Sequence, residues 1–93
     1  MSKSILQNDK YCYVCGKLTD LQDHHIYFGS KRRTSERNGF KAWLCITHHT
    51  ENKTGVHSNR ELDLTLKRHC QTVYEKNHSR EDFMKLTGRN YLP

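Results

Sequence analysis

The middle of the chain reads Leu44-Cys45-Ile46-Thr47-His48-His49, and this stretch decides how the rest of the sequence is interpreted. Nearer the N-terminus, Cys12-Tyr13-Val14-Cys15 repeats the same spacing, with two metal-binding residue types separated by two other residues. Zinc prefers thiolate and imidazole ligands in tetrahedral structural sites. The two knuckles therefore predict one structural zinc site, formed by Cys12, Cys15, Cys45 and His48. Buried free cysteines, which are common in protein cores, are the alternative explanation.

The length and composition of the chain explain why a structural metal ion is expected to stabilise the fold. The 93 residues suffice for one domain, and a domain this short buries a smaller share of its surface than a larger one. Hydrophobic residues make up only 33% of the sequence. No apolar run could span a bilayer, and residues 1–10 lack the apolar segment of a secretory signal. We therefore expect an intracellular protein, in which such cysteines more often bind metal than form disulfides.

The charge of the sequence favours a polyanionic partner. Sixteen Lys and Arg residues against ten Asp and Glu residues give a net charge of +6 at pH 7. Such a charge favours contacts with nucleic-acid phosphates, although it also serves simple solubility. A basic loop is predicted over residues 31–38, and it or its flank carries the candidate phosphate contacts Lys31, Arg32, Arg33, Arg37 and Lys41. Such contacts would read no base sequence, and a solvated charged loop is the alternative.

Local patterns predict a hairpin with a long connection. Residues 1–10 are polar and without periodicity, so we predict a flexible, frayed lead-in that tolerates truncation. Residues 21–28 are rich in aromatic and branched side chains and end at Gly29, which predicts a strand. Residues 40–45 show the alternation typical of a second strand that pairs with the first.

The rest of the chain is predicted to be helical. Residues 47–54 suffice for one or two helical turns, with Gly55 as a left-handed C-cap. A capping box that begins at Ser58 predicts a long helix over residues 59–76. The same start signal recurs before a short final helix between Ser79 and Gly88.

Histidine is the second chemical signal in the sequence. Five of the seven histidines fall in or beside the predicted hairpin and short helix: His24, His25, His48, His49 and His57. Such clusters are hard to explain as packing, because each buried imidazole needs its own hydrogen-bond partners. Neutral imidazole binds divalent metals and accepts a proton near pH 7, which are the two functions that hydrolysis requires. Cys70, by contrast, lies on an apolar helical stripe and is assigned to core packing.

Together these residues resemble the HNH endonucleases, the ββα-metal or His-Me finger family. The resemblance rests on Cys12-x2-Cys15, Asp23-His24-His25-Ile26 and Leu44-Cys45-x2-His48-His49, within residues 11–57. Residues 58–93 resemble the helical part of small HNH-like proteins encoded in bacteriophages and prophages. The resemblance implies one α+β domain over residues 11–93. Its ββα-metal core, a hairpin followed by a helix, would be stabilised by a Cys3His zinc site. A long C-terminal helix and a short final helix would support this core.

The resemblance also implies the role of a general base. His25, the second histidine of its pair, matches the residue that deprotonates the attacking water. Asn38 is the nearest candidate for the family's Asn, which orients the loop that carries the base. Its place in an Asn-Gly pair suits a simple turn at least as well.

A second, catalytic metal site is implied by the remaining histidines. His24 and His49 match the family's metal ligands, and His57 is a candidate for a further ligand. Neighbouring residues of a regular strand point to opposite faces, so Asp23 is an alternative to His24. Whether His48 or His49 completes the zinc site stays open at the level of sequence.

The function implied is that of a metal-dependent endonuclease or nickase. It would hydrolyse DNA phosphodiester bonds during phage replication, recombination or packaging, in the cytoplasm of a bacterial host. The catalytic divalent cation would be Mg²⁺, Mn²⁺, Ni²⁺ or Zn²⁺, and imidazole ligands favour the last three. The alternative is a catalytically inactive zinc module that acts as a nucleic-acid or protein adaptor, including an inhibitor of a host defence.

Overall fold

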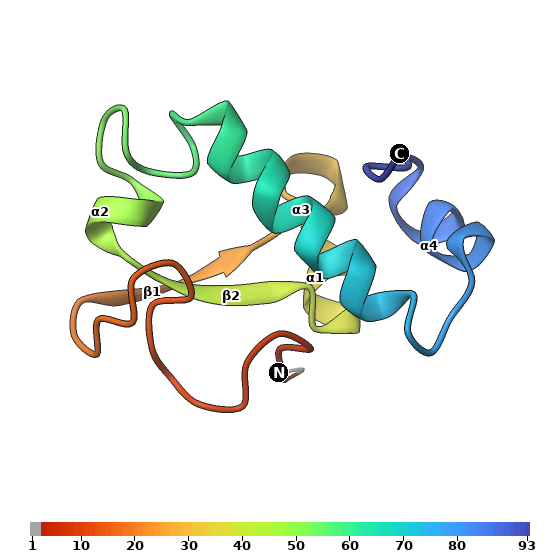
Figure 1. Ribbon diagram of the computed structural model, residues 1–93, viewed down its shortest axis with the longest axis horizontal. Helices are drawn as coiled ribbons and strands as arrows, with labels where there is room; N and C mark the ends of the chain where they lie inside the picture. The colour runs from red at the N-terminus through yellow and green to blue at the C-terminus, as the bar shows by residue number, and fades with distance from the viewer. Residues whose placement is uncertain (1–2) are drawn as a thin grey trace.

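A two-stranded antiparallel sheet forms the centre of the computed structural model, which describes residues 3–93 (Figure 1). Strand β1 (Leu21–His25) pairs with β2 (Lys41–Cys45). The register sets Leu21 opposite Cys45 and His25 opposite Lys41. Both predicted strands are therefore confirmed as a hairpin, and the expectation of an α+β fold holds.

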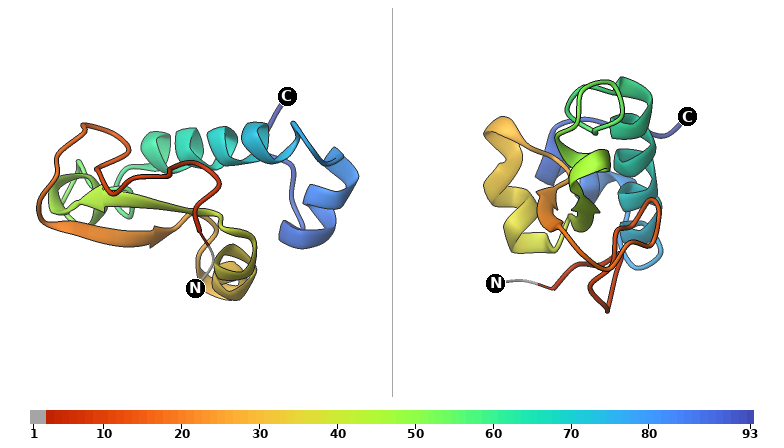
Figure 2. Two further views of the ribbon diagram at one scale, coloured as in Figure 1. Left: turned by 90° about the horizontal axis from the view of Figure 1, so that it is seen from below. Right: turned by 90° about the vertical axis from the view of Figure 1, so that its left-hand side faces the viewer.

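Helices lie on both sides of this hairpin. In chain order they are η1 (Gly29–Lys31), α1 (Arg32–Asn38), α2 (Ile46–His49), α3 (Arg60–Tyr74) and α4 (Arg80–Thr87). Figure 2 shows α1 and α3 on opposite sides of the hairpin, with α4 beyond the C-terminal end of α3. No helix within residues 3–93 combines the length and the apolar character needed to cross a bilayer.

The hydrophobic core lies between the hairpin and the C-terminal helices. Leu44 of β2, Leu66 of α3 and Phe83 of α4 are all buried there. Cys70 is fully buried in the same cluster, and burial raises the pKa of its thiol to about 12. A thiol that stays protonated in an apolar core is unreactive, so the assignment of Cys70 to core packing is confirmed.

The ends of α3 and α4 show which of the predicted capping residues cap a helix. Ser79 caps α4 by accepting a hydrogen bond from the backbone N–H of Asp82, and Gly88 ends the helix at φ +78°. Both were predicted. For α3 the predicted capping box is wrong, because the side chain of Asn59, and not Ser58, accepts from the N–H of Leu62.

The segment after β2 differs from its prediction. Helix α2 has only four residues, and turns replace the rest of the predicted helix over residues 47–54. Gly55 is not a left-handed cap. A Cβ atom at this position would lie 2.7 Å from the carbonyl oxygen of Glu51, so the residue is small because the chain packs closely on itself.

The predicted basic loop over residues 31–38 is wrong, because Lys31 ends η1 and the rest of this segment forms helix α1. Only Ser35 of this helix is buried, so the sequence has no apolar stripe that would have revealed it. The predicted strand over residues 21–28 is also too long. Beyond His25 the chain leaves the regular ladder, and the N–H of Tyr27 donates to the Ser35 hydroxyl at 3.0 Å.

The expectation of a frayed lead-in is corrected from residue 3 onward. Gln7 is buried, and its side-chain carbonyl oxygen accepts a hydrogen bond from the N–H of Trp43 at 2.8 Å. Its amide nitrogen donates to the carbonyl oxygen of Tyr11 at 2.7 Å. The N–H of Ile5 donates to the carbonyl oxygen of Gly39 at 2.9 Å. This segment therefore covers the outer edge of β2.

Replacing Gln7 by Ala should destabilise the domain. The substitution leaves the N–H of Trp43 and the carbonyl oxygen of Tyr11 without their partner, at a cost of about 1–3 kcal/mol. Urea unfolding measures this loss. Asn8→Ala, one residue away and exposed, is the matched control. Equal unfolding midpoints for the two variants would show that the segment is not part of the folded domain.

Candidate metal centres

The two cysteine knuckles come together as predicted. The ligand atoms of Cys12, Cys15, Cys45 and His48, the Cys3His cluster, all lie within 4.8 Å of one another. The Cys45 Sγ atom lies 3.2 Å from His48 Nδ1, and Cys15 Sγ lies 3.8 Å from Cys45 Sγ. Three thiols and one imidazole at these distances could hold a zinc ion. The structure therefore assigns His48, and not His49, to this cluster.

Backbone hydrogen bonds shape the first knuckle and tie it to β2. The N–H of Tyr13 donates to the carbonyl oxygen of Trp43 at 2.8 Å, and the N–H of Gly16 donates to that of Cys12 at 2.8 Å. Burial by itself would raise the pKa of the Cys12 thiol, but hydrogen bonds from the backbone at Cys45, Cys15 and Val14 lower it to about 6. Cys12 is thus prepared to act as a thiolate, the form that binds metal.

A second cluster joins three histidines from distant parts of the sequence. His24 of β1, His49 of α2 and His57 form this His cluster, in which one ligand atom of each lies within 4.8 Å of the others. The Nε2 atoms of His49 and His57 lie 3.1 Å apart. The ring centroid of His24 lies 5.2 Å from each of the other two. The predicted convergence of these three imidazoles is therefore present in the structure.

The surroundings of His24 suit a metal ligand. This side chain is almost fully buried, and among the described residues its Nε2 atom has no hydrogen-bond partner. Burial, together with the neighbouring His49 and His57, lowers the pKa of His24 to about 3. Burial also lowers the pKa of His49. These shifts favour the neutral imidazole in His24 and His49, which is the form that binds a cation.

The orientation of His49 is set by a residue that the sequence analysis missed. The Oε1 atom of Gln22 lies 2.6 Å from His49 Nδ1, so Nδ1–H donates to it and Nε2 faces His57. Metal-binding histidines commonly donate their second ring N–H to such a partner. No sequence signal marks Gln22, because the contact depends on how α2 packs against β1.

His25 leaves β1 on the face opposite to His24, as the alternation of strand side chains requires. Its Nε2 atom lies 3.0 Å from Oε1 of Glu36 on α1. Both histidines nevertheless line one pocket of about 220 Å³, together with Asp23, Phe28, Arg32, His49 and His57. The candidate general base therefore borders the His cluster without belonging to it.

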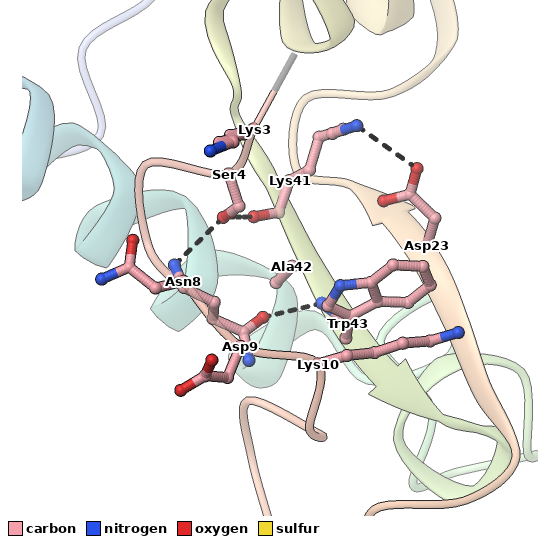
Figure 3. Close-up of a pocket in the computed structure, with 10 residues that line it drawn as sticks. Lys3, Ser4, Asn8, Asp9, Lys10, Asp23, Lys41, Ala42 and Trp43 are labelled. Atoms are coloured by element: carbon pink, nitrogen blue, oxygen red, sulfur yellow. Dashed lines mark hydrogen bonds and ion pairs between the residues drawn. The ribbon is translucent and has the colours of Figure 1, made fainter. Parts of the chain in front are cut away.

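Asp23 does not replace His24 in the His cluster. It lies on the face of β1 that carries His25, and its Oδ2 atom is 3.6 Å from Lys41 Nζ (Figure 3). An oxygen of Asp23, a nitrogen of His25 and an oxygen of Glu36 form a third close group, but the Lys41 ammonium already contacts both carboxylates. A lysine thus supplies the positive charge at this position.

Two predicted site residues are placed elsewhere. Asn38 ends α1, its side-chain amide donates to the carbonyl oxygen of Thr34 at 2.8 Å, and it does not line the pocket of His25. Lys41 is only 6% exposed, so its prediction as a surface phosphate contact is corrected. In both cases the unpredicted helix α1 is the physical reason, since it contains Asn38 and contributes Glu36 as the partner of Lys41.

The remaining predicted phosphate contacts stay near the pocket or on the surface. Arg32 and Arg33 are exposed and line a pocket of about 380 Å³ next to His25. Arg32 also lines the pocket of the His cluster. Arg37 is exposed and Lys31 is partly buried.

Comparisons with known proteins assign no family to the chain. No family model matches it, and no curated protein or solved structure matches it either. The functional argument therefore depends on the geometry and chemistry of the two clusters and of the pocket beside them.

Proposed function

We propose that this protein is a metal-dependent endonuclease or nickase of the HNH type, which hydrolyses phosphodiester bonds in DNA. One observation carries the proposal: the three imidazoles of the His cluster and a fourth imidazole, His25, line one pocket. Phosphodiester hydrolysis needs a cation that stabilises charge on the phosphate and a base that activates water. Side chains suited to both functions are adjacent here.

In the proposed reaction, His24, His49 and His57 would hold a divalent cation. When bound, the cation supplies positive charge that polarises the phosphate and stabilises the leaving 3′ oxygen. His25 takes a proton from water, the water oxygen bonds to phosphorus, and the bond from phosphorus to the 3′ oxygen breaks. The 3′ oxygen then takes a proton from solvent. Arg32 lines the same pocket, and its guanidinium suits contact with phosphate oxygens.

The Cys3His cluster has a different role in this proposal. Three thiols and one imidazole make a closed set of four ligands, which is typical of structural zinc and leaves no position for substrate. The cluster joins the N-terminal knuckle to β2 and α2. A zinc ion there would fix α2, which carries His49, to the end of the hairpin that contains Cys45.

DNA is the proposed partner because of charge as well as chemistry. The chain carries a net charge of +6, and Arg32, Arg33 and Arg37 are exposed on the helix that borders the pocket. Arginine pairs well with phosphate, and such contacts hold the backbone without selecting a sequence. The resemblance to phage-encoded HNH proteins adds the setting we propose, which is phage replication, recombination or packaging in a bacterial cell.

Metal analysis combined with plasmid nicking tests the proposal. Purified protein reconstituted with Zn²⁺, then with Mn²⁺, should bind one zinc and one further divalent cation per chain. His57→Ala should keep the zinc and lose the second cation, because His57 belongs only to the His cluster. We expect supercoiled DNA to be nicked by the wild type and not by this variant, with Mn²⁺, Ni²⁺ or Zn²⁺ more effective than Mg²⁺.

Other outcomes would contradict the proposal in defined ways. A protein that binds only the zinc and binds DNA without cutting it would be an adaptor. A protein that binds no DNA at all would point to a protein partner, such as a component of a host defence. Equal nicking by wild type and His57→Ala would exclude the His cluster from catalysis.

A further inference from the structure

The side chain of Glu36 joins the candidate base to a buried lysine. Its Oε1 atom lies 3.0 Å from His25 Nε2, and its Oε2 atom lies 3.2 Å from Lys41 Nζ. His25 and Lys41 are opposite each other in the register of the two strands, so both side chains lie on the same face of the hairpin. Glu36 approaches that face from α1 and uses one carboxylate oxygen for each residue.

Glu36 is itself held in position. Lys41 is 6% exposed, and a buried ammonium group requires charged or hydrogen-bonding partners. Asp23 provides the second of these partners, with its Oδ2 atom 3.6 Å from Nζ (Figure 3). Leaving Lys41 without Glu36 would be costly, so the lysine restrains the carboxylate next to His25.

We infer that Glu36 is the positioning residue for His25, and this inference rests on the proposed hydrolase function. A carboxylate can only accept a hydrogen bond, so Nε2–H of His25 donates to it. The partner of one ring nitrogen determines the state of the other, which leaves Nδ1 as the atom that takes the proton from water. Lys41 and Asp23 anchor this arrangement. Glu36 thereby orients the base directly, whereas Asn38 was the candidate for orienting the loop that carries it.

Two double variants isolate the hydrogen bond from the ion pair. In Glu36→Gln/Lys41→Met the side-chain carbonyl can still accept from His25, and no ammonium competes for it. In Glu36→Ala/Lys41→Met that acceptor is gone, while every other change is the same. We expect kcat for nicking to be about 10–100-fold lower in the Ala variant than in the Gln variant, with KM unchanged. Glu81→Ala, an exposed carboxylate on α4, is the surface control.

NMR of the zinc-loaded proteins gives a readout that does not depend on activity. The Nε2 proton of His25 should exchange slowly in the wild type and in the Gln variant, and should be lost to fast exchange in the Ala variant. If both double variants share one NMR signature and one kcat, the inference is overturned. If the NMR pattern holds but no protein cuts DNA, the hydrolase proposal fails and the positioning of His25 by Glu36 stands. If a Lys41 variant does not fold, single Glu36→Gln and single Glu36→Ala replace the pair, because both remove the carboxylate charge and only Gln keeps an acceptor for His25.

Discussion

We expect that removal of zinc from the Cys3His cluster will unfold this protein. The Cys3His cluster connects the N-terminal knuckle to the end of β2 and to α2, and two of its cysteines, Cys12 and Cys45, are buried. Structural zinc contributes about 10–16 kcal/mol of apparent binding free energy in zinc-finger peptides, whereas a whole domain is stable by only about 5–15 kcal/mol. A short chain with a small core therefore has little stability left without the ion.

Chelation and substitution at Cys45 test this expectation together. Cys45→Ser, or wild type treated with a strong chelator, should lose NMR dispersion and near-ultraviolet circular dichroism, and zinc should restore both only in the wild type. Cys70→Ala is the matched control, because Cys70 is equally buried but lies outside the cluster. It should bind one zinc and stay folded with some loss of stability. A chelated wild type that kept its native spectrum would refute a structural zinc site.

The second large effect is expected from His25→Ala. Removal of a general base lowers a rate by about 10²–10⁴-fold, and kcat for plasmid nicking should fall within this range. His25 belongs to neither the Cys3His cluster nor the His cluster, so the variant should retain both metals. That combination separates loss of the base from loss of the cation, which His57→Ala is expected to cause.

The control for His25 is an exposed histidine elsewhere in the fold. His69 lies on α3, is exposed, and contacts the ring of Tyr13. His69→Ala should nick DNA at the wild-type rate. Should His25→Ala also cut at that rate, His25 would have no part in the mechanism and the inference drawn for Glu36 would lose its functional meaning.

The groups of candidate metal ligands were predictable because residues that bind metals can be recognised in a sequence by their type and spacing. Two residues separate Cys12 from Cys15, and two residues separate Cys45 from His48. Once a hairpin brings these two pairs together, the spacing is enough to predict one closed cluster. The signals for the start of α4 at Ser79 and for its left-handed end at Gly88 are equally local. Such features depend on a few neighbouring residues, and the sequence contains them directly.

The environment of His25 was not predictable in the same way. The sequence suggested Asn38 as its orienting partner and Lys41 as a surface cation, and it provided no reason to select Glu36. Helix α1 has no apolar stripe, so neither its existence nor its approach to the hairpin could be read from periodicity.

By itself, the sequence determined the ligand types, the two knuckles, the pair of strands and the long helix, because each depends on spacing or periodicity within a short segment. Only the tertiary structure decided that His48 joins the cysteines while His49 turns to His24 and His57. It also decided that α1 carries Glu36 to His25 and that Gln7 covers β2. These contacts arise from the packing of segments that are distant in the chain, and no local sequence pattern determines which side chains are brought into contact.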